Sequence, residues 1–345
     1  MTAALSYPIA APPEPGQAIP LAAGVHWARL PVPGPLRHIN VWLLEDGDGW
    51  TLVDTGMDVP AARAAWEGTL HAYLGGRPLT RIICTHHHPD HAGLAAWLSE
   101  RHGAPVFMSG PEFSLLQGLL TTAERPAEQA RRLAAFARDG LDATDAMRPA
   151  LSGQSYRKIM SGVPADVRLL GDGDVVATGR TRWTARLVRG HSDAQLVFHT
   201  EDPALLIGGD QVLPRISSNI GIYPERADPD PIASFLASFD GLEALVPEPL
   251  VLPSHGSVFS GLRLRLAELR SHHATTLEAV IGLVTAPATA REVAERLFRS
   301  PLDSLNLMLA VGESLANLEH LAARGRLAVT EAPGGPRRYQ PRRAF

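Results

Sequence analysis

The sequence predicts an α/β fold with a large strand-rich body over residues 1–262 and a smaller, mainly helical region over residues 263–345. Three observations predict this division. Strand and helix patterns alternate early in the chain, short strand patterns return after residue 166, and long helical patterns dominate beyond residue 262. At 345 residues and 45% hydrophobic content, the chain can bury a substantial core and is expected to form one large and one small domain.

The body is predicted to begin with an irregular arm, because residues 1 to about 35 are rich in Pro, Ala and Gly. The β-rich runs 38–44 and 50–53 flank a Gly/Asp cluster, which is typical of a hairpin. Apolar spacing and a terminal Gly-Gly pair predict a helix over residues 59–75. Next we expect a strand over 79–84, a helix ending near residue 101 and a strand over 105–108.

Residues 111 to about 160 show few strand patterns and are predicted to form a helical insertion between two strand-rich halves. After the insertion, strands bounded mostly by Gly or Asp are expected at 167–170, 174–177, 181–188, 195–199 and 204–207. An amphipathic pattern predicts a helix over 231–246, and the last expected strand of the body is 250–252.

The region beyond residue 262 differs from the body in pattern and in charge. Helices are predicted over 262–284, 288–298 and 303–324, followed by strands over 327–330 and 338–340. Three helices followed by a β-ribbon are the layout of a winged helix, although a plain helical cap with a loose tail also fits. Twelve Arg against eight acidic residues give this region a charge of +4, so the body carries −8 within the overall −4.

Composition excludes several classes of protein. The single cysteine, Cys84, rules out an intrachain disulfide framework and a cysteine-based zinc module. No apolar stretch is long enough for a transmembrane helix, so no membrane partner is expected. The N-terminus lacks a basic start and is broken by prolines, which favours a cytoplasmic protein over a secreted one. The 14 histidines are the most informative residues, since histidine is the commonest metal ligand.

Four side chains that commonly bind metals lie close together in the segment 85–93, directly after a predicted strand. His86 and His88 are two residues apart on extended backbone and therefore point to one face. Asp90 and His91 lie where a helix is expected to begin, and the change of period turns them toward the same space. This spacing predicts a site suited to more than one divalent cation.

Three further donors follow later strands. His191, Asp210 and His255 each come after an apolar strand pattern and a turn of small residues. A single histidine in such a place is usually only a surface residue. Three donors in succession, behind a cluster of four, indicate one shared site.

These residues and the stretch Val53-Asp54-Thr55-Gly56 occur in the order of the motifs of the metallo-β-lactamase superfamily, which residues 20–262 resemble. The resemblance implies a four-layer αββα sandwich with metals at one edge of its two sheets. It implies one metal held by His86, His88 and His191. It implies a second metal held by Asp90, His91 and His255, with Asp210 bridging both metals and Asp54 orienting the ligands. His87 would point away from the metals, behind the ligands or into solvent.

The resemblance also implies a metal-dependent hydrolase. Two divalent cations about 3.5–4 Å apart can hold a hydroxide between them, so that no nucleophilic Ser or Cys is required. We expect this bridging hydroxide to cleave a carbonyl ester, thioester or lactone, while Asp90 or Asp210 accepts and passes on the proton. Zinc best suits the imidazole and carboxylate donors of this binuclear site, and iron or manganese would also fit.

Several alternatives to this hydrolase remain open. True zinc β-lactamases generally lack a bridging aspartate, so Asp210 argues against antibiotic hydrolysis. Residues 263–345 resemble the winged-helix appendage of the subgroup that contains β-lactamase-like protein 2, which includes an endoribonuclease. A phosphodiesterase or endoribonuclease on single-stranded RNA is therefore the main alternative, and a DNA-binding regulator a weaker one.

The expected partner is a small acyl substrate rather than nucleic acid, since Tyr339 is the only tyrosine of the tail and its charge is modest. The appendage would then shape the way into the site or form a homodimer contact. Arg215 and Asn219 follow Asp210 closely and are candidate substrate contacts, with Arg215 neutralising an anionic group. Tyr156 is a third candidate because the insertion is expected to cover the metal edge, although a solvated face explains Tyr156 as well.

Overall fold

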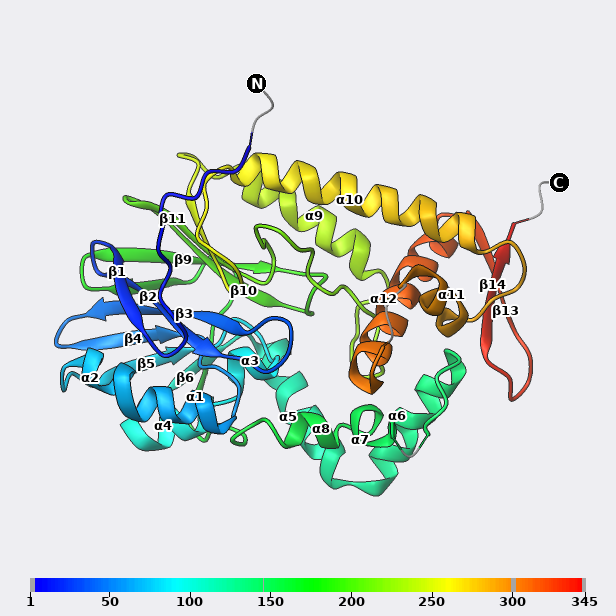
Figure 1. Ribbon diagram of the computed structural model, residues 1–345, viewed down its shortest axis with the longest axis horizontal. Coiled ribbons are helices and arrows are strands. Elements are labelled where there is room, and N and C mark those ends of the chain that lie inside the picture. Colours follow the sequence, from blue (N-terminus) through cyan, green and yellow to red (C-terminus); the bar gives the residue numbers. More distant parts are fainter. Residues whose placement is uncertain (1–3, 145, 299–301, 343–345) are drawn as a thin grey trace.

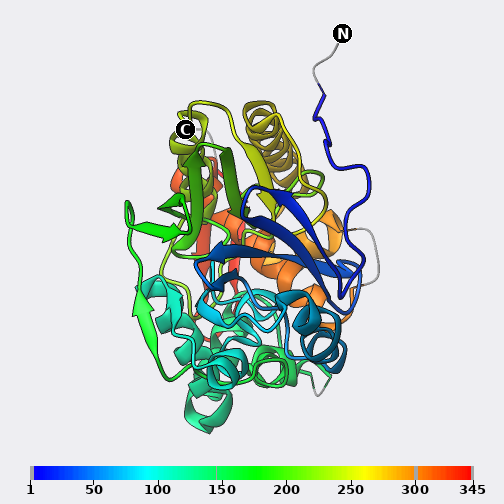
Figure 2. The same cartoon turned by 90° about the vertical axis from the view of Figure 1, so that its left-hand side faces the viewer.

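The computed structural model describes residues 4–144, 146–298 and 302–342. Its body is the predicted four-layer αββα sandwich, in which two sheets pack face to face and helices cover both outer faces (Figures 1 and 2). The helices on the first sheet are α1 (Pro60–Ala65), α2 (His71–Leu74) and α4 (Ala95–His102). The helices on the second sheet are α9 (Pro231–Glu243) and α10 (Leu262–Leu283).

The first sheet has seven strands that follow one another in chain order. They are β1 (Ala18–Ala22), β2 (Val25–Pro31), β3 (His38–Asp46), β4 (Gly49–Val53), β5 (Leu79–Ile83), β6 (Val106–Met108) and β7 (Val167–Leu169). Strands β1 to β4 pair antiparallel, whereas β4 to β7 pair parallel. The predicted hairpin is confirmed as β3–β4.

The second sheet has five strands in the order β12-β11-β10-β9-β8. Their bounds are β8 (Val175–Thr178), β9 (Thr181–Val188), β10 (Gln195–Glu201), β11 (Ala204–Gly209) and β12 (Leu250–Pro253). Strands β9, β11 and β12 run in the same direction, because β10 pairs antiparallel with both β9 and β11, and β11 pairs parallel with β12. Their carboxyl ends therefore share one edge of the sheet.

The prediction of an irregular arm over residues 1–35 is wrong for residues 18–31, which contain the whole of β1 and β2. The inner strand β2 is buried almost throughout, with Trp27, Ala28 and Leu30 fully covered. A strand covered on both faces shows no alternation of polar and apolar residues, which is why the pattern in the sequence did not reveal it.

The predicted helix over residues 59–75 is confirmed in position, with one irregularity. A π-helical turn, η1 (Trp66–Leu70), separates α1 from α2. The segment ends at Gly75, whose φ of 63° lies in the left-handed region that favours glycine.

Three cores hold the sandwich together, one of them between the first sheet and its helices, and a further core, called the third core below, lies outside the sandwich. Trp27, Trp42 and Trp183 are buried between the two sheets, while the second core lies under α9 and α10. The third core joins the insertion to the C-terminal region, since Phe136 and Leu151 of the insertion pack with residues such as Leu315. The insertion therefore packs directly against the C-terminal region.

The described residues of the insertion form four helices: α5 (Gly110–Glu124), α6 (Pro126–Arg138), α7 (Arg148–Leu151) and α8 (Gln154–Arg157). The C-terminal region contains α11 (Ala290–Leu297), α12 (Ser304–Ala323) and the two-stranded ribbon β13 (Leu327–Glu331) and β14 (Arg337–Pro341). Helix α10 belongs to both parts, because Leu266 and Leu269 pack on the second sheet while Val280 packs in the third core. No helix of the described residues has the length and apolar character that a membrane span requires.

Candidate metal centre

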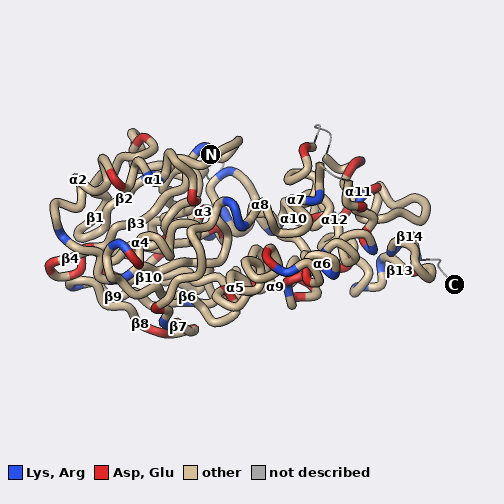
Figure 3. The backbone as a smooth tube through the Cα atoms, turned by 90° about the horizontal axis from the view of Figure 1, so that it is seen from below, with Lys and Arg blue, Asp and Glu red and all other residues tan. Residues whose placement is uncertain are grey.

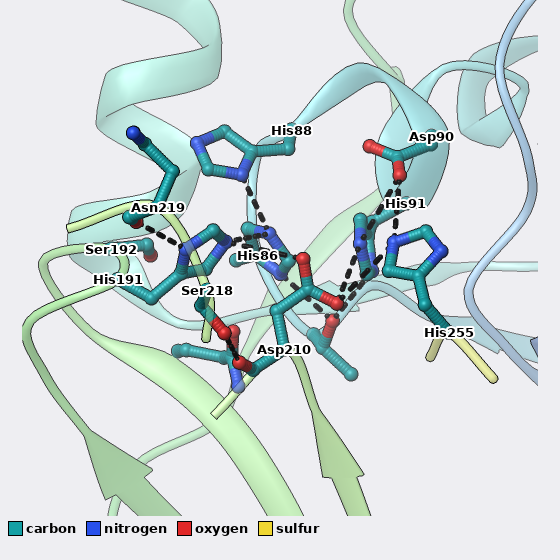
Figure 4. Close-up of polar contacts among 12 residues, drawn as sticks. His86, His88, Asp90, His91, His191, Ser192, Asp210, Ser218, Asn219 and His255 are labelled. Atoms are coloured by element: carbon teal, nitrogen blue, oxygen red, sulfur yellow. Dashed lines mark hydrogen bonds and ion pairs between the residues drawn. The ribbon is translucent and has the colours of Figure 1, made fainter. Parts of the chain in front are cut away.

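The seven predicted ligands meet where the carboxyl ends of four strands converge (Figure 4). His86, His88, Asp90 and His91 follow β5. The other three follow strands of the second sheet: His191 after β9, Asp210 after β11 and His255 after β12. The common direction of these three strands places their last turns beside the turn that follows β5.

The turn after β5 is shaped by a proline. His88 has extended backbone, with φ −61° and ψ 149°, and Pro89 occupies the first turn of the short helix α3 (Pro89–Ala92). Proline is well suited to this position because it has no N–H to leave unpaired. The change from strand to helix turns Asp90 and His91 toward the ligands on the strand side, as predicted.

The donor atoms form three overlapping groups; two of them have the members that the family resemblance implies, and in the remaining one Asp210 lies with His86 and His91. His86, His88 and His191 form the first, and the Nε2 atom of His86 lies 2.9 Å from Nδ1 of His88 and 3.2 Å from Nε2 of His191. Asp90, His91 and His255 form the second, with Oδ2 of Asp90 3.2 Å from Nε2 of His255. Within each group the donor atoms lie within 4.8 Å of one another.

Asp210 lies between the two groups. Its Oδ2 atom is 3.3 Å from Nε2 of His191, and its Oδ1 atom is 3.5 Å from Nε2 of His91. Both Oδ1 of Asp210 and Nε2 of His91 are buried without a hydrogen-bond partner. Buried polar atoms are nearly always paired, so this pair of unsatisfied atoms fits a site built to hold cations.

The second ring nitrogen of three histidines is fixed by an oxygen acceptor. His91 Nδ1 lies 2.8 Å from Oδ2 of Asp54, while the Nδ1 atoms of His191 and His255 contact the carbonyl oxygens of Asn219 and His38 at 2.8 and 2.9 Å. These contacts direct each Nε2 atom into the centre. Asp54 itself has a φ of 63° and accepts a hydrogen bond from the Thr85 amide at 2.8 Å.

Electrostatics prepare the site for metal binding. Burial, reinforced by the neighbouring imidazoles, holds the pKa of both His86 and His88 well below its ordinary value. Both rings are therefore neutral, which is the state that binds metal. Burial opposes the charged form of His91, but the carboxylates of Asp54, Asp90 and Asp210 outweigh it and raise the pKa of His91 well above its ordinary value. The site thus has an excess of negative charge around its second group.

Glu112, on α5, is a residue that sequence reasoning missed. It is completely buried, and its carboxylate contacts the Nδ1 atom of His87 at 2.6 Å and accepts from the amides of His87 and Ala194 at 3.1 and 2.7 Å and from the hydroxyl of Ser192. Burial by itself disfavours the charge, but His87 and these hydrogen bonds lower the pKa of Glu112 to about 2. This carboxylate therefore holds the loop of His86–His91 against the loop of His191.

His87 lies outside the ligand groups, as expected, but it does not face solvent. Its side chain is buried against Glu112, and the hydroxyl of Tyr156 donates to its carbonyl oxygen at 2.6 Å. Tyr156 thus contacts the ligand loop from the insertion side.

A buried ion pair supports the His191 loop. Arg226 contacts Asp193 at 2.8 Å and donates to the carbonyl oxygen of His191 at 3.1 Å. Gly190 is required beside it, because a Cβ atom there would lie 2.6 Å from the Cα atom of Phe235. Neither contact was visible in the sequence, since each joins residues more than thirty positions apart.

The other two candidate substrate residues differ in their surroundings. Asn219 contributes its backbone oxygen to His191, while its side chain contacts Tyr223 at 2.5 Å and Glu313 of α12 at 3.2 Å. Arg215 is exposed and lines a cavity that includes His255. A larger hollow of about 930 Å³ lies between α6, α11 and the β13–β14 ribbon, and none of the seven predicted ligands lines it.

Comparison with known proteins assigns a family to both parts of the chain. The profile of the metallo-beta-lactamase superfamily matches residues 34–255, and that of the metallo-beta-lactamase-like C-terminal domain matches residues 277–342. The chain is 25% identical over 301 residues to the probable metallo-hydrolase YqjP of Bacillus subtilis (strain 168), covering 86% of this chain and 91% of the relative. It is 26% identical over 264 residues to the acyl-coenzyme A thioesterase MBLAC2 of Gallus gallus, covering 72% and 83%.

Two solved structures resemble the whole chain. A beta-lactamase domain protein from Burkholderia ambifaria is 36% identical, with a TM-score of 0.87 and 98% coverage of both chains. The metallo-beta-lactamase family protein TTHA1429 from Thermus thermophilus is 30% identical, with a TM-score of 0.80, covering 93% of this chain and 99% of its own. Both parts of the chain, and their arrangement, therefore have counterparts in other proteins.

Proposed function

Because the chain belongs to the metallo-β-lactamase superfamily and is a metal-dependent hydrolase, we propose that it uses two divalent metal ions to cleave a carbonyl ester, thioester or lactone. The observation that carries this proposal is the grouping of seven donors into two sets with Asp210 between them. Zinc is the metal we propose, because the donors are imidazoles and carboxylates, with iron and manganese as alternatives.

His86, His88 and His191 would hold one ion, Asp90, His91 and His255 the other, and Asp210 would bridge them. Two such ions supply a water ionised at neutral pH and polarise the carbonyl under attack. The protein supplies the donor atoms in fixed positions and places buried carboxylates around the metal centre.

Asp90 and Asp210 are the two carboxylates that we propose for moving a proton. The side chain of Asp90 is 13% exposed, against 1% for Asp54, and its Oδ2 atom lies beside Nε2 of His255 at 3.2 Å. In the proposed hydrolysis the water oxygen bonds to the acyl carbon while the bond to the leaving sulfur or oxygen breaks. Asp90, or Asp210, accepts the proton of the water and passes it to the leaving group, which gives a carboxylic acid and a thiol or alcohol.

The nature of one relative supports an acyl substrate. MBLAC2 is named an acyl-coenzyme A thioesterase, and 83% of its length matches this chain. We therefore propose thioesters as the preferred substrates among the acyl compounds. We further propose that the protein is not a true β-lactamase, because of the bridging position of Asp210.

The C-terminal region offers little support for the nucleic-acid alternative. In a winged helix, the helix corresponding to α12 enters the groove of DNA. Here α12 is covered by its neighbours, with Val311, Leu315 and Leu318 buried. Basic and acidic segments are interspersed over this region (Figure 3), and both arginines of strand β14 are paired, Arg337 with Glu331 at 3.0 Å and Arg338 with Glu292 at 3.2 Å.

Metal removal tests the proposed function. We expect dialysis against EDTA to abolish hydrolysis of a thioester, ester and lactone panel, and added zinc, iron(II) or manganese to restore it. Asp210→Ala should lower kcat/KM by more than about 100-fold. A loss of up to about 100-fold is typical when a residue that only supports a metal ligand is changed. Asp48→Ala, in the exposed β3–β4 turn, is the matched control and should retain activity.

The same panel includes bis-p-nitrophenyl phosphate and a chromogenic cephalosporin, neither of which should be cleaved. Phosphodiester cleavage without acyl hydrolysis would favour the endoribonuclease alternative. A protein that binds no metal and hydrolyses nothing after reconstitution would contradict the proposal as a whole.

A further inference from the structure

A cavity of about 400 Å³ opens beside the ligand His255. This volume lies within the range of about 300–1,000 Å³ that is usual for small-molecule sites. Its walls come from segments far apart in the sequence: the N-terminal arm, the loop before β3, the turn after β12 and the segment that follows Asp210. The arm is held in place by a backbone pair between Ser6 and Ser260, with hydrogen bonds of 2.9 and 3.2 Å.

The wall of this cavity is unusually apolar for an exposed surface. Tyr7, Leu36 and Ile216 line it and are 38%, 41% and 50% exposed. They come from three different segments, so their proximity is a product of the fold and not of one apolar stretch. Exposed apolar side chains that gather in a hollow are typical of a binding groove.

The cavity also carries positive charge with no acidic residue in its wall. Arg215 and Arg29 line it, and no Asp or Glu does. Among the described residues neither guanidinium forms an ion pair, although the carboxylate of Glu14, outside the wall, opposes part of the fall in the pKa of Arg29 that burial causes. Arg29 is only 9% exposed and donates to neutral acceptors, Oδ1 of Asn40 at 3.0 Å and the carbonyl oxygen of Gly256 at 2.8 Å. A buried cation whose hydrogen-bond partners are all neutral is stabilised when an anion approaches.

Arg215 is the cation that remains free to meet a ligand. Its guanidinium carbon lies 5.8 Å from the centre of the Tyr7 ring, at the side of the apolar wall. A charged group and an apolar surface are thus presented together, next to the metal ligand His255.

We propose that this cavity binds one arm of the substrate, an arm that is both apolar and anionic, while the scissile carbonyl lies at the metal centre. This rests on the proposed function, because it places the reacting carbonyl beside His255. Arg215 pairs with the anionic group, and Tyr7, Leu36 and Ile216 cover the apolar segment. The anionic group belongs either to the leaving group or to the acyl group of the substrate. In both cases the cavity binds an anionic group together with an apolar segment.

Matched substrates test the role of Arg215 with the metal-loaded protein. S-octanoyl mercaptoacetate has an anionic leaving group and S-octanoyl mercaptoethanol a neutral one. The monothioester of suberic acid with methanethiol, compared with S-methyl octanethioate, moves the anion to the acyl side. In one of these pairs, Arg215→Ala should reduce the ratio of kcat/KM for the anionic over the neutral member about tenfold, through KM, as expected for a lost charge-assisted contact.

The pair that responds identifies the arm that the cavity holds. Arg215→Lys should restore part of the ratio, and Arg215→Glu should lower it further. Arg182→Ala, which removes an exposed arginine of β9 outside the cavity, is the matched control and should keep the wild-type ratio. An unchanged ratio for Arg215→Ala in both pairs would overturn the inference while leaving the proposed hydrolase intact.

A binding measurement separates the cavity from the reaction. Calorimetric titration with 1-octanesulfonate and 1-octanol should show tighter binding of the sulfonate, and Arg215→Ala should remove the difference. Ile216→Gln should weaken binding of 1-octanesulfonate more than that of ethanesulfonate. If no thioester is hydrolysed but this selectivity is present, the proposed function fails and the cavity assignment stands. Equal binding of both octyl compounds to the wild-type protein would refute the assignment.

Discussion

At the scale of single residues, the site depends on side chains that stand behind the ligands. Asp54, the carbonyl oxygen of Asn219 and that of His38 each hold one imidazole in the orientation that directs Nε2 inward. Glu112 acts on backbone segments instead, because it binds the loop after β5 and the loop after β9 with one carboxylate. The loop that carries His191 is therefore held against the loop that carries His86 and His88 by a residue that contacts none of these three ligands.

Glu112→Gln tests this role. The amide can keep one or two of the contacts but loses the charge that holds His87, so the two loops should separate slightly. We expect zinc affinity, measured by competition with a chromophoric chelator, to fall by about 10-fold, the lower end of the effect of such supporting residues. Glu124→Gln, at the exposed end of the same helix, should leave the affinity unchanged. Wild-type zinc affinity in Glu112→Gln would show that the two loops keep their positions without this carboxylate.

At the scale of elements, α12 connects the C-terminal region to the metal edge. Its Glu313 accepts a hydrogen bond from the side chain of Asn219 at 3.2 Å, and the backbone of Asn219 accepts one from His191. Burial raises the pKa of Glu313 from 4.5 to about 7. Helix α12 thus holds the Glu313 side chain in a buried position that disfavours its ionised form.

Glu313 makes stability depend on pH. Its folded-state pKa is raised, so the folded protein keeps a proton that the unfolded chain releases above about pH 4.5. The free energy of unfolding should therefore fall as the pH rises from 4.5 to 7, by about 2–3 kcal/mol. Glu313→Gln keeps the contact with Asn219 but cannot ionise, so it should be more stable than the wild type at pH 8.

Urea unfolding at pH 5 and pH 8 measures this difference. The advantage of Glu313→Gln should be small at pH 5 and largest at pH 8, and Glu295→Gln, on the exposed face of α11, serves as the control. An equal difference at both pH values would mean that Glu313 does not titrate in this range.

At the scale of the whole molecule, the insertion and the C-terminal region form one unit. Their shared core contains Phe136 and Leu151 from the insertion together with Val311 and Leu318 from α12. Arg132 of α6 also donates to the carbonyl oxygen of Leu151 at 2.7 Å and pairs with Glu225, which lies in the segment between Asn219 and α9. Along the chain the whole second sheet lies between the two parts, so only the tertiary fold brings them together.

Phe136→Ala tests whether they unfold together. Removing a buried phenyl ring from a core typically costs about 3–5 kcal/mol. We expect hydrogen exchange to accelerate in α11 and α12 as well as in α6, although none of the C-terminal residues is altered. Leu70→Ala, in the core of the first sheet, should leave α11 and α12 protected. Faster exchange confined to α6 would contradict a shared unit.

The convergence of the seven donor residues and the order of most elements could be predicted because their signals are local. The spacing from His86 to His91 is short enough for strand and helix periods to decide which side chains converge, and His191, Asp210 and His255 follow strands whose patterns are plain. The helical insertion and the three C-terminal helices were visible for the same reason, since helical period is a property of neighbouring residues.

The sequence by itself determined the fold class, the strand-end positions and the residues that can bind metal, because each depends on residues close together in the chain. Only the tertiary structure decided which distant residues support them. Strand β2 lacks a pattern because both its faces are covered, and Glu112 meets Ser192 only once the two sheets are packed. The cavity of Arg215 and Tyr7 likewise exists only where separate segments converge, since contact between distant residues follows from packing and not from spacing.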